Sequence, residues 1–221
     1  MGMIRVALAL AVLLTHLPVA SFKFMGGGLA VQSFFIVSGF YMALVLDGKY
    51  SDRSLFYSNR VLRLLPTYFV MMALCALALF GFGISATASP QTFAEAFSHP
   101  ATALILGFEN LALVGQELLY WFRLDAEGLS FDASGAQPTE TSSVAWQALL
   151  VPQSWSLSME LMFYALAPFL VRLGWRSLVL IAAGSIALRL AGYWLPVDYG
   201  IWQGRFFPTA LFLFVFGVLA Q

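Results

Sequence analysis

The sequence predicts an all-α fold, a polytopic bundle of about six to seven transmembrane helices that forms a single domain over residues 1–221. Two observations support this. Hydrophobic residues make up 61% of the chain and charged residues 10%, whereas soluble domains carry about 25% charged residues. The apolar residues also gather in long runs, and a membrane-crossing helix needs about 20 mostly apolar residues. The mean hydropathy of +0.84 agrees with this class.

Five apolar stretches reach or nearly reach the length of a span, and a sixth runs to the end of the chain. They are residues 3–22, 29–46, 64–84, 156–174, 177–195 and 205–220. The stretch 101–122 differs because it contains Glu109, Asn110 and Glu117, and acids are costly in the bilayer centre. It is therefore a span facing a polar interior, a re-entrant segment or an interfacial helix. Residues 123–145 are rich in Gly, Ser, Thr and Asp and predict an extended polar loop.

The basic residues near the ends of the spans predict the orientation. Four of them lie between the second and third spans, namely Lys49, Arg53, Arg60 and Arg63. This loop and the N-terminus are therefore expected in the cytoplasm. The arginines of "RLGWR" (172–176) also prefer the cytoplasm. All these placements agree if residues 101–122 make no full crossing, which leaves residues 123–153 outside.

Charge and cysteine content exclude two classes of site. The formal net charge is +0, and the eleven basic residues lie at segment ends rather than in a patch, so no nucleic-acid partner is expected. Cys75 is the only cysteine. The sequence therefore has no disulfide framework and no Cys spacing typical of a metal site.

Arg5 and His16 are the residues of the first apolar run that hydrocarbon tolerates least. Helix geometry places them on nearly the same face, about 16 Å apart along the axis. With Arg5 at the inner surface, His16 lies beyond the bilayer middle, where an ionisable side chain must face protein or a water-filled cavity. The simpler interpretations are a histidine bonded to a backbone carbonyl and an arginine that only anchors the helix end.

Glu160 lies about one turn into another apolar span, in "PQSWSLSMELMFYALAP". Ser156 precedes it by four residues and therefore shares its helix face. A histidine and a glutamate at compatible depth can act as a base and its orienting group, which activates a hydroxyl nucleophile. Alternatively, Glu160 is an interfacial acid favoured by the helix N-terminus.

Arg60 and Arg63 are three residues apart, just before the third span. On a helix both guanidinium groups leave one face, and a pair of forks suits phosphate groups. The alternative is that both are ordinary cytoplasmic arginines whose heads reach the lipid headgroups.

These motifs together resemble the acyltransferase 3 family of integral-membrane O-acyltransferases. The resemblance rests on the spacing of Arg5 and His16 and on three segments in the family's order. The segments are "GGGLAVQSFFIVSGF" from residue 26, "RVLRLLPTYF" from residue 60 and "WSLSMELMFYALAP" from residue 155. The final "RFFPTALFLFVFGVLA" also resembles a later span of that family.

The resemblance implies a function and a site. Members move an acyl group, commonly acetyl, from cytoplasmic acyl-CoA to a sugar hydroxyl of a cell-surface or exported glycan, and are not aminoacyltransferases. His16 matches the essential histidine and Arg5 its arginine partner, Arg60 and Arg63 the pair on the donor side, and Glu160 the acid of W-S-L-x-x-E. His16 then either deprotonates the acceptor hydroxyl or carries the acyl group transiently.

The same resemblance implies the surroundings of the protein. Acyl-CoA is the donor substrate, no cofactor is bound permanently, and the partners are the lipid bilayer and a glycan or lipid-linked saccharide acceptor. A multi-pass protein of the bacterial inner membrane is expected, with its N-terminus in the cytoplasm. Family members usually have about ten spans, so the chain is expected to be truncated and to hold the N-terminal two-thirds of the family domain.

Two other functions are compatible with the sequence. One is a proton-coupled transporter or lipid-handling protein in which His16 and Glu160 form a proton relay. The other is an inactive truncated remnant, which would insert normally but transfer no acyl group.

Overall fold

The computed structural model describes residues 2–17, 25–48, 52–85, 87, 89–135 and 142–221. The chain divides into two compact units. Unit 1 consists of residues 1–56, 163–191 and 207–221, and unit 2 of residues 57–162 and 192–206. The boundary passes through two helices, α3 (Arg53–Ala76) and α6 (Trp155–Leu170).

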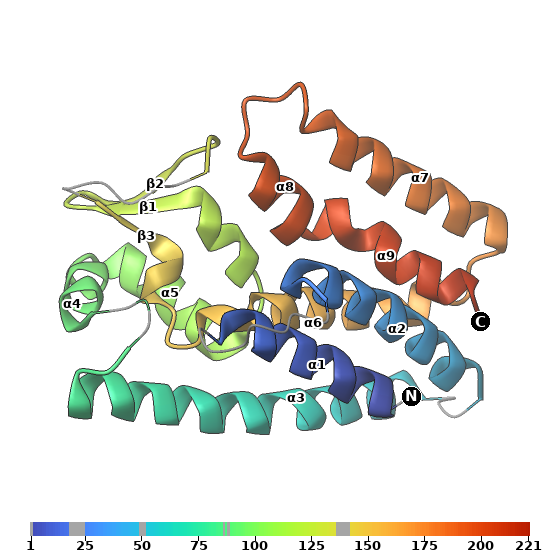
Figure 1. Cartoon of the computed structure of the whole chain (residues 1–221), viewed down its shortest axis with the longest axis horizontal. Coiled ribbons are helices and arrows are strands. Elements are labelled where there is room, and N and C mark those ends of the chain that lie inside the picture. The colour runs from blue at the N-terminus through green and yellow to red at the C-terminus, as the bar shows by residue number, and fades with distance from the viewer. Residues whose placement is uncertain (1, 18–24, 49–51, 86, 88, 136–141) are drawn as a thin grey trace. The chain divides into compact units, whose positions relative to one another are not determined.

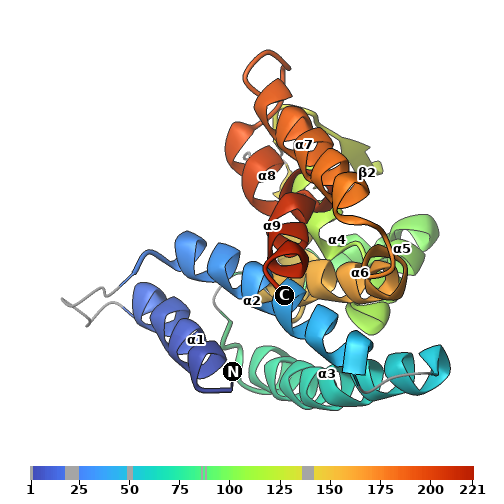
Figure 2. The same ribbon diagram turned by 90° about the vertical axis from the view of Figure 1, so that its right-hand side faces the viewer.

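Every regular element among the described residues of unit 1 is a helix. Besides parts of α3 and α6, it contains α1 (Gly2–His16), α2 (Gly27–Gly48), α7 (Trp175–Ala191) and α9 (Phe207–Leu219). Helix α9 packs against both α2 and α7, and α1 packs against α2, as Figures 1 and 2 show. Each helix coincides with an apolar run of the sequence.

The α2–α9 crossing brings two backbones together at glycines. A Cβ atom on Gly39 would overlap the carbonyl oxygen of Phe214, and one on Gly217 would overlap the backbone of Ile36 and Phe40. Aromatic rings fill the space beside this contact, since Phe214 stacks on Phe35 with ring centroids 4.6 Å apart. Small residues at a crossing allow this approach because no side chain separates the helices.

Unit 2 combines helices with a small sheet. Its elements, besides its parts of α3 and α6, are η1 (Leu77–Gly81), α4 (Pro90–Ser98), α5 (Pro100–Ala112), η2 (Gln116–Trp121), β1 (Phe122–Asp125), β2 (Gly128–Phe131), β3 (Ser143–Val144), η3 (Ala145–Ala148), η4 (Pro152–Ser154) and α8 (Tyr199–Arg205). Helix α4 begins at Pro90 because Ser89 caps it, accepting a hydrogen bond from the Thr92 N–H at 3.1 Å.

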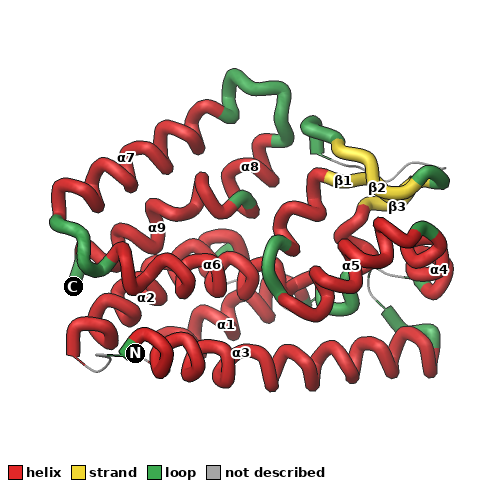
Figure 3. Tube along the Cα trace, turned by 180° about the vertical axis from the view of Figure 1, so that it is seen from behind, coloured by secondary structure: helices red, strands yellow, loops and turns green. Residues whose placement is uncertain are grey.

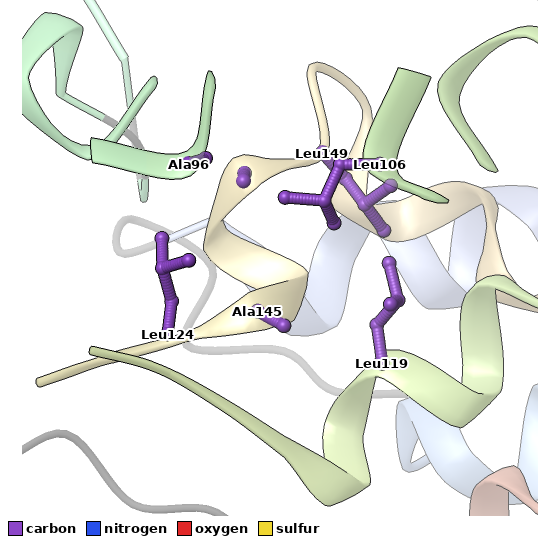
Figure 4. Close-up of a cluster of buried hydrophobic side chains, with 7 residues drawn as sticks. Ala96, Leu106, Leu119, Leu124, Ala145 and Leu149 are labelled. Atoms are coloured by element: carbon purple, nitrogen blue, oxygen red, sulfur yellow. The ribbon is translucent and has the colours of Figure 1, made fainter. Parts of the chain in front are cut away.

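The sheet has the antiparallel order β2-β1-β3 and is drawn in yellow in Figure 3. It lies where the sequence predicts a polar loop. A tight turn joins β1 and β2, with Asp125 opposite Gly128, and Gly128 has a φ of 113°. Below the sheet, a core cluster joins α4, α5, η2, β1 and η3. Leu106, Leu119 and Leu149 converge in it (Figure 4).

Three helices of the described residues are long and apolar enough to cross a membrane. They are Gly27–Gly48, Arg53–Gly81 and Tyr199–Leu219. Helix α5 has 13 residues, about 20 Å at 1.5 Å per residue, which is too short for the ~30 Å hydrocarbon core. The apolar helices confirm the predicted class, whereas the count of six to seven spans stays a prediction.

Candidate functional site

The predicted site residues divide between the two units. Arg5 and His16 lie on α1 of unit 1, while Arg60, Arg63 and Glu160 belong to unit 2. The pairing of His16 with Glu160 stays a prediction.

His16 is the last residue of α1 and is exposed. Its Nδ1 lies 2.9 Å from the carbonyl oxygen of Val12. A carbonyl oxygen can only accept, so this bond places the ring hydrogen on Nδ1. In the neutral imidazole Nε2 then carries the lone pair, which is the form a general base requires.

Arg5 is half-buried against α2. Its Nη2 donates to Ser38 Oγ at 3.0 Å, and its guanidinium lies 5.2 Å from the ring centroids of both Phe34 and Tyr41. These three partners are spaced along α2 so that they share one helix face. The "GGGLAVQSFFIVSGF" segment thus supplies the hydrogen bond and one cation–π contact that hold Arg5, and Tyr41, which directly follows it, supplies the second cation–π contact.

In unit 2, Arg60 and Glu160 are buried charged residues. Arg60 is 6% exposed on α3 and Glu160 is 1% exposed on α6, whereas Arg63 is exposed. Charged side chains are almost never buried to this degree without compensation. The two arginines of "RVLR" therefore have different surroundings, although the sequence predicts that they leave one helix face.

A set of buried or half-buried polar residues, here called the buried polar cluster, lies in the same unit, and each of them takes part in a hydrogen bond through its side chain or its backbone. Its members come from α3, α5, η2, η4 and α6, and are Tyr68, Glu109, Asn110, Gln116, Glu117, Ser154 and Ser158. Of the two acids of residues 101–122, Glu117 accepts a hydrogen bond from Ser158. Glu109 is bonded through its backbone carbonyl, while its buried carboxylate oxygen Oε2 has no hydrogen-bond partner among the described residues.

Asn110 connects α5 to the segment that follows η3. Its Nδ2 donates to the carbonyl oxygens of Leu106 at 2.8 Å and Ala148 at 3.1 Å. Its Oδ1 accepts from the Leu150 N–H at 2.9 Å, and its own carbonyl accepts from Tyr68 Oη at 2.7 Å. One side chain therefore bonds three backbone groups, of which the Ala148 carbonyl and the Leu150 N–H lie outside a helix interior.

Gln116 connects η2 to three other parts of unit 2. Its Nε2 donates to the Glu109 carbonyl oxygen at 2.9 Å and to Tyr68 Oη at 3.2 Å. Its Oε1 accepts from Ser154 Oγ at 2.6 Å. The Gln116 side chain is fully buried, so the amide is fixed at both ends.

Ser158 joins the first turns of α6 to η2. It accepts a hydrogen bond from the Gly115 N–H at 2.9 Å and donates to Glu117 Oε2 at 2.6 Å. Both side chains are at most 1% exposed. Burial raises the pKa of Glu117, and the hydrogen bond from Ser158 opposes this increase.

Glu109 has the most perturbed carboxyl group of the cluster. Burial first, and then the nearby Glu117 carboxyl, raise the pKa of Glu109 to about 7. Both residues lie in the short segments α5 and η2, outside the candidate spans. A carboxyl group with such a pKa exchanges its proton near neutral pH, a property found often at functional sites.

The sequence alone indicates part of this cluster. Glu109, Asn110 and Glu117 are conspicuous because they interrupt an apolar stretch, but Tyr68, Gln116 and Ser154 carry no such signal. Their partners lie 38 to 48 residues away along the chain, a separation at which no helical or strand periodicity applies. Among the described residues, no group of His, Cys, Asp and Glu could hold a metal ion.

The family model of the acyltransferase 3 family, described as an acyltransferase domain, matches residues 2–221. No curated protein and no solved structure matches the chain. The family match supports an acyltransferase-type function, and together with the apolar helices it makes the chain a membrane protein. The match covers nearly the whole chain, so the protein belongs to the acyltransferase 3 family.

Proposed function

We propose that the protein is a membrane O-acyltransferase that moves an acyl group, acetyl in the first instance, from cytoplasmic acyl-CoA to a glycan hydroxyl. The acceptor is a cell-surface or exported glycan, or a lipid-linked saccharide. The proposed location is the bacterial inner membrane with the N-terminus in the cytoplasm, which agrees with Lys49, Arg53, Arg60 and Arg63 between the second and third apolar runs.

The bond from His16 Nδ1 to the Val12 carbonyl oxygen is the observation that carries this proposal. It leaves Nε2 of the neutral ring as the proton acceptor. Nε2 takes the proton of the acceptor hydroxyl while the oxygen attacks the thioester carbonyl carbon. The carbon–sulfur bond then breaks, and the CoA thiolate takes the proton back from His16, so that an ester and free CoA are formed.

The other predicted residues have supporting roles in this proposal. Arg60 and Arg63 bind the phosphates of CoA, since guanidinium groups form charge-assisted hydrogen bonds to phosphate oxygens. Glu160 orients the imidazole or the acceptor. Arg5 is fixed by Ser38, Phe34 and Tyr41, so its charge is held in one position on α1.

The test compares cells that express the parent, His16→Ala and His99→Ala at equal membrane abundance. His99 is the matched control because it is the only other histidine and lies between α4 and α5. Mass spectrometry of the surface glycans should find the added acyl mass with the parent and with His99→Ala. Loss of a general base lowers the rate by about 10²- to 10⁴-fold, so His16→Ala should show no detectable mass.

Acyl transfer by His16→Ala at the parental level would overturn the role of His16. A parent that adds no acyl mass, and releases no free CoA from labelled acetyl-CoA in membrane vesicles, would overturn the proposed function. Proton-driven transport by those vesicles without any effect of CoA would favour the transporter instead.

A further inference from the structure

The turn that joins α5 to η2 is strained. Leu113 has a φ of 54° and Gly115 a φ of 89°, and the Leu113 side chain is fully buried. A non-glycine residue in the left-handed region costs on the order of 1–3 kcal/mol and persists only where the surroundings enforce it. The contacts around this turn must therefore be strong enough to hold Leu113 in its strained conformation.

Those contacts are made to the first turns of α6. Ser158 Oγ accepts from the Gly115 N–H at 2.9 Å and donates to Glu117 Oε2 at 2.6 Å. The hydroxyl thus uses its donor and an acceptor position on two residues of the same turn. We call the set Gly115, Glu117 and Ser158 the latch.

The latch holds α6 two residues before Glu160. Two residues correspond to about 200° around a helix, so the latch contacts α6 on the side opposite to Glu160. Both Ser158 and Glu160 are at most 1% exposed. The latch can therefore fix the rotation of the first turns of α6 without occupying the space next to the Glu160 carboxylate.

We propose that the latch is a positioning element, in which Glu117 and Ser158 act through α6 to hold the Glu160 carboxylate in its working orientation. The inference rests on the proposed acyltransferase function, in which Glu160 orients the imidazole or the acceptor. Glu117 and Ser158 are positioning residues: they contact one another and the Gly115 backbone, and they act on the reaction only through Glu160.

The experiment uses the full chain in membranes, with two variants that break the latch and one that keeps it. Ser158→Ala removes the hydroxyl, and Glu117→Ala removes its acceptor. Glu117→Gln keeps an oxygen that accepts from Ser158. Ser130→Ala and Glu127→Gln are the matched controls, since both residues are exposed on the β1–β2 hairpin.

Two readouts are combined. Hydrogen exchange of peptide 155–162 should be faster in Ser158→Ala and Glu117→Ala than in the parent, while exchange of peptide 89–98 stays unchanged. The kcat for acyl transfer should fall on the order of 10- to 100-fold, as a misplaced group would cause. The KM for acyl-CoA should stay near its parental value because the phosphate-binding arginines are intact.

Glu117→Gln should leave both readouts at their parental values. Ser158→Ala combined with Glu117→Ala should be no worse than Ser158→Ala alone, because loss of the hydroxyl already breaks the contacts to both Gly115 and Glu117. Parental exchange in both latch-breaking variants would overturn the latch, and faster exchange with parental kcat would overturn its role in positioning. A parent without acyl transfer would overturn the proposed function and this catalytic role, while the exchange data would still decide whether the latch restrains α6.

Discussion

At the α2–α9 crossing of unit 1, two helices touch backbone to backbone, whereas in the buried polar cluster of unit 2 the contacts are hydrogen bonds between side chains and backbone. The crossing depends on the absence of atoms, since Gly39 and Gly217 leave no room for a Cβ. The cluster depends on the presence of particular atoms, such as the amide of Asn110 with its three backbone partners.

The difference shows what each region can tolerate. Apolar helices in a membrane gain stability from close van der Waals packing, so shape decides whether the crossing forms. A buried polar network has directional contacts, and each missing partner leaves a polar group without compensation. The crossing should therefore be sensitive to added volume, and the cluster to lost hydrogen-bonding groups.

The largest effect is expected from Gly217→Ala. The new Cβ would overlap the backbone of Ile36 and Phe40, and neither backbone can move without separating α2 from α9. We expect a loss of about 3 kcal/mol or more, the upper end of the range for overpacking. Unfolding in detergent, followed by circular dichroism, measures this loss.

Gly184→Ala is the control for this variant. Gly184 lies in α7 with open space around the position of its Cβ, and alanine is the better helix former, so this variant should be as stable as the parent or slightly more stable. Equal stability of the two glycine variants would contradict close packing at the crossing.

The second largest effect is expected from Asn110→Ala. The substitution leaves the Leu150 N–H and the Ala148 carbonyl without the partners that Asn110 provides, at a cost of about 1–3 kcal/mol. The same unfolding measurement applies, with Gln91→Ala on the exposed face of α4 as the control. A parental midpoint for Asn110→Ala would show that the cluster adds no stability.

Ser185→Ala is a smaller test, because Ser185 is a polar contact inside the apolar unit. Its Oγ donates to the Pro208 carbonyl oxygen at 2.7 Å and accepts from the Phe212 N–H at 3.0 Å. We expect a loss of about 1 kcal/mol, less than for Asn110→Ala. Ser177→Ala, exposed on the same helix, should have no effect. A larger loss at Ser185 than at Asn110 would reverse the comparison.

The sequence predicts the helices better than the contacts between them. The six apolar runs overlap α1, α2, α3, α6, α7 and α9 because a long run of apolar residues is a local property, although α3 begins at Arg53, well before its run. The sheet is missed because its strands have two to four residues, and their pairing joins distant positions, such as Arg123 with Val144. Too few residues alternate to indicate strands.

The site follows the same pattern. Arg5, His16 and Glu160 are conspicuous as ionisable residues in apolar runs, and Glu109 and Glu117 for the same reason. Their partners are not conspicuous in the sequence, because serines are common in helices. Ser38 lies 33 residues from Arg5, and Ser158 lies 41 residues from Glu117. Which serine completes a site is decided by tertiary packing.

The effect of Glu109→Gln differs from the others because it depends on pH. The pKa of Glu109 is about 7 in the folded protein, raised from an ordinary value of 4.5 by burial and by the Glu117 carboxyl. As the pH rises from 4.5 to 7, the unfolded chain loses this proton before the folded protein does, so stability falls across that window and stays lower above it.

Glu109→Gln removes this fall, so its unfolding midpoint relative to the parent should be higher at pH 8 than at pH 5. Glu95→Gln, exposed on α4, should keep the parental pH dependence. A difference between Glu109→Gln and the parent that is the same at both pH values would mean that Glu109 titrates alike in the folded and unfolded chains, and the cluster would then hold the Glu109 carboxyl group at no pH-dependent cost in stability.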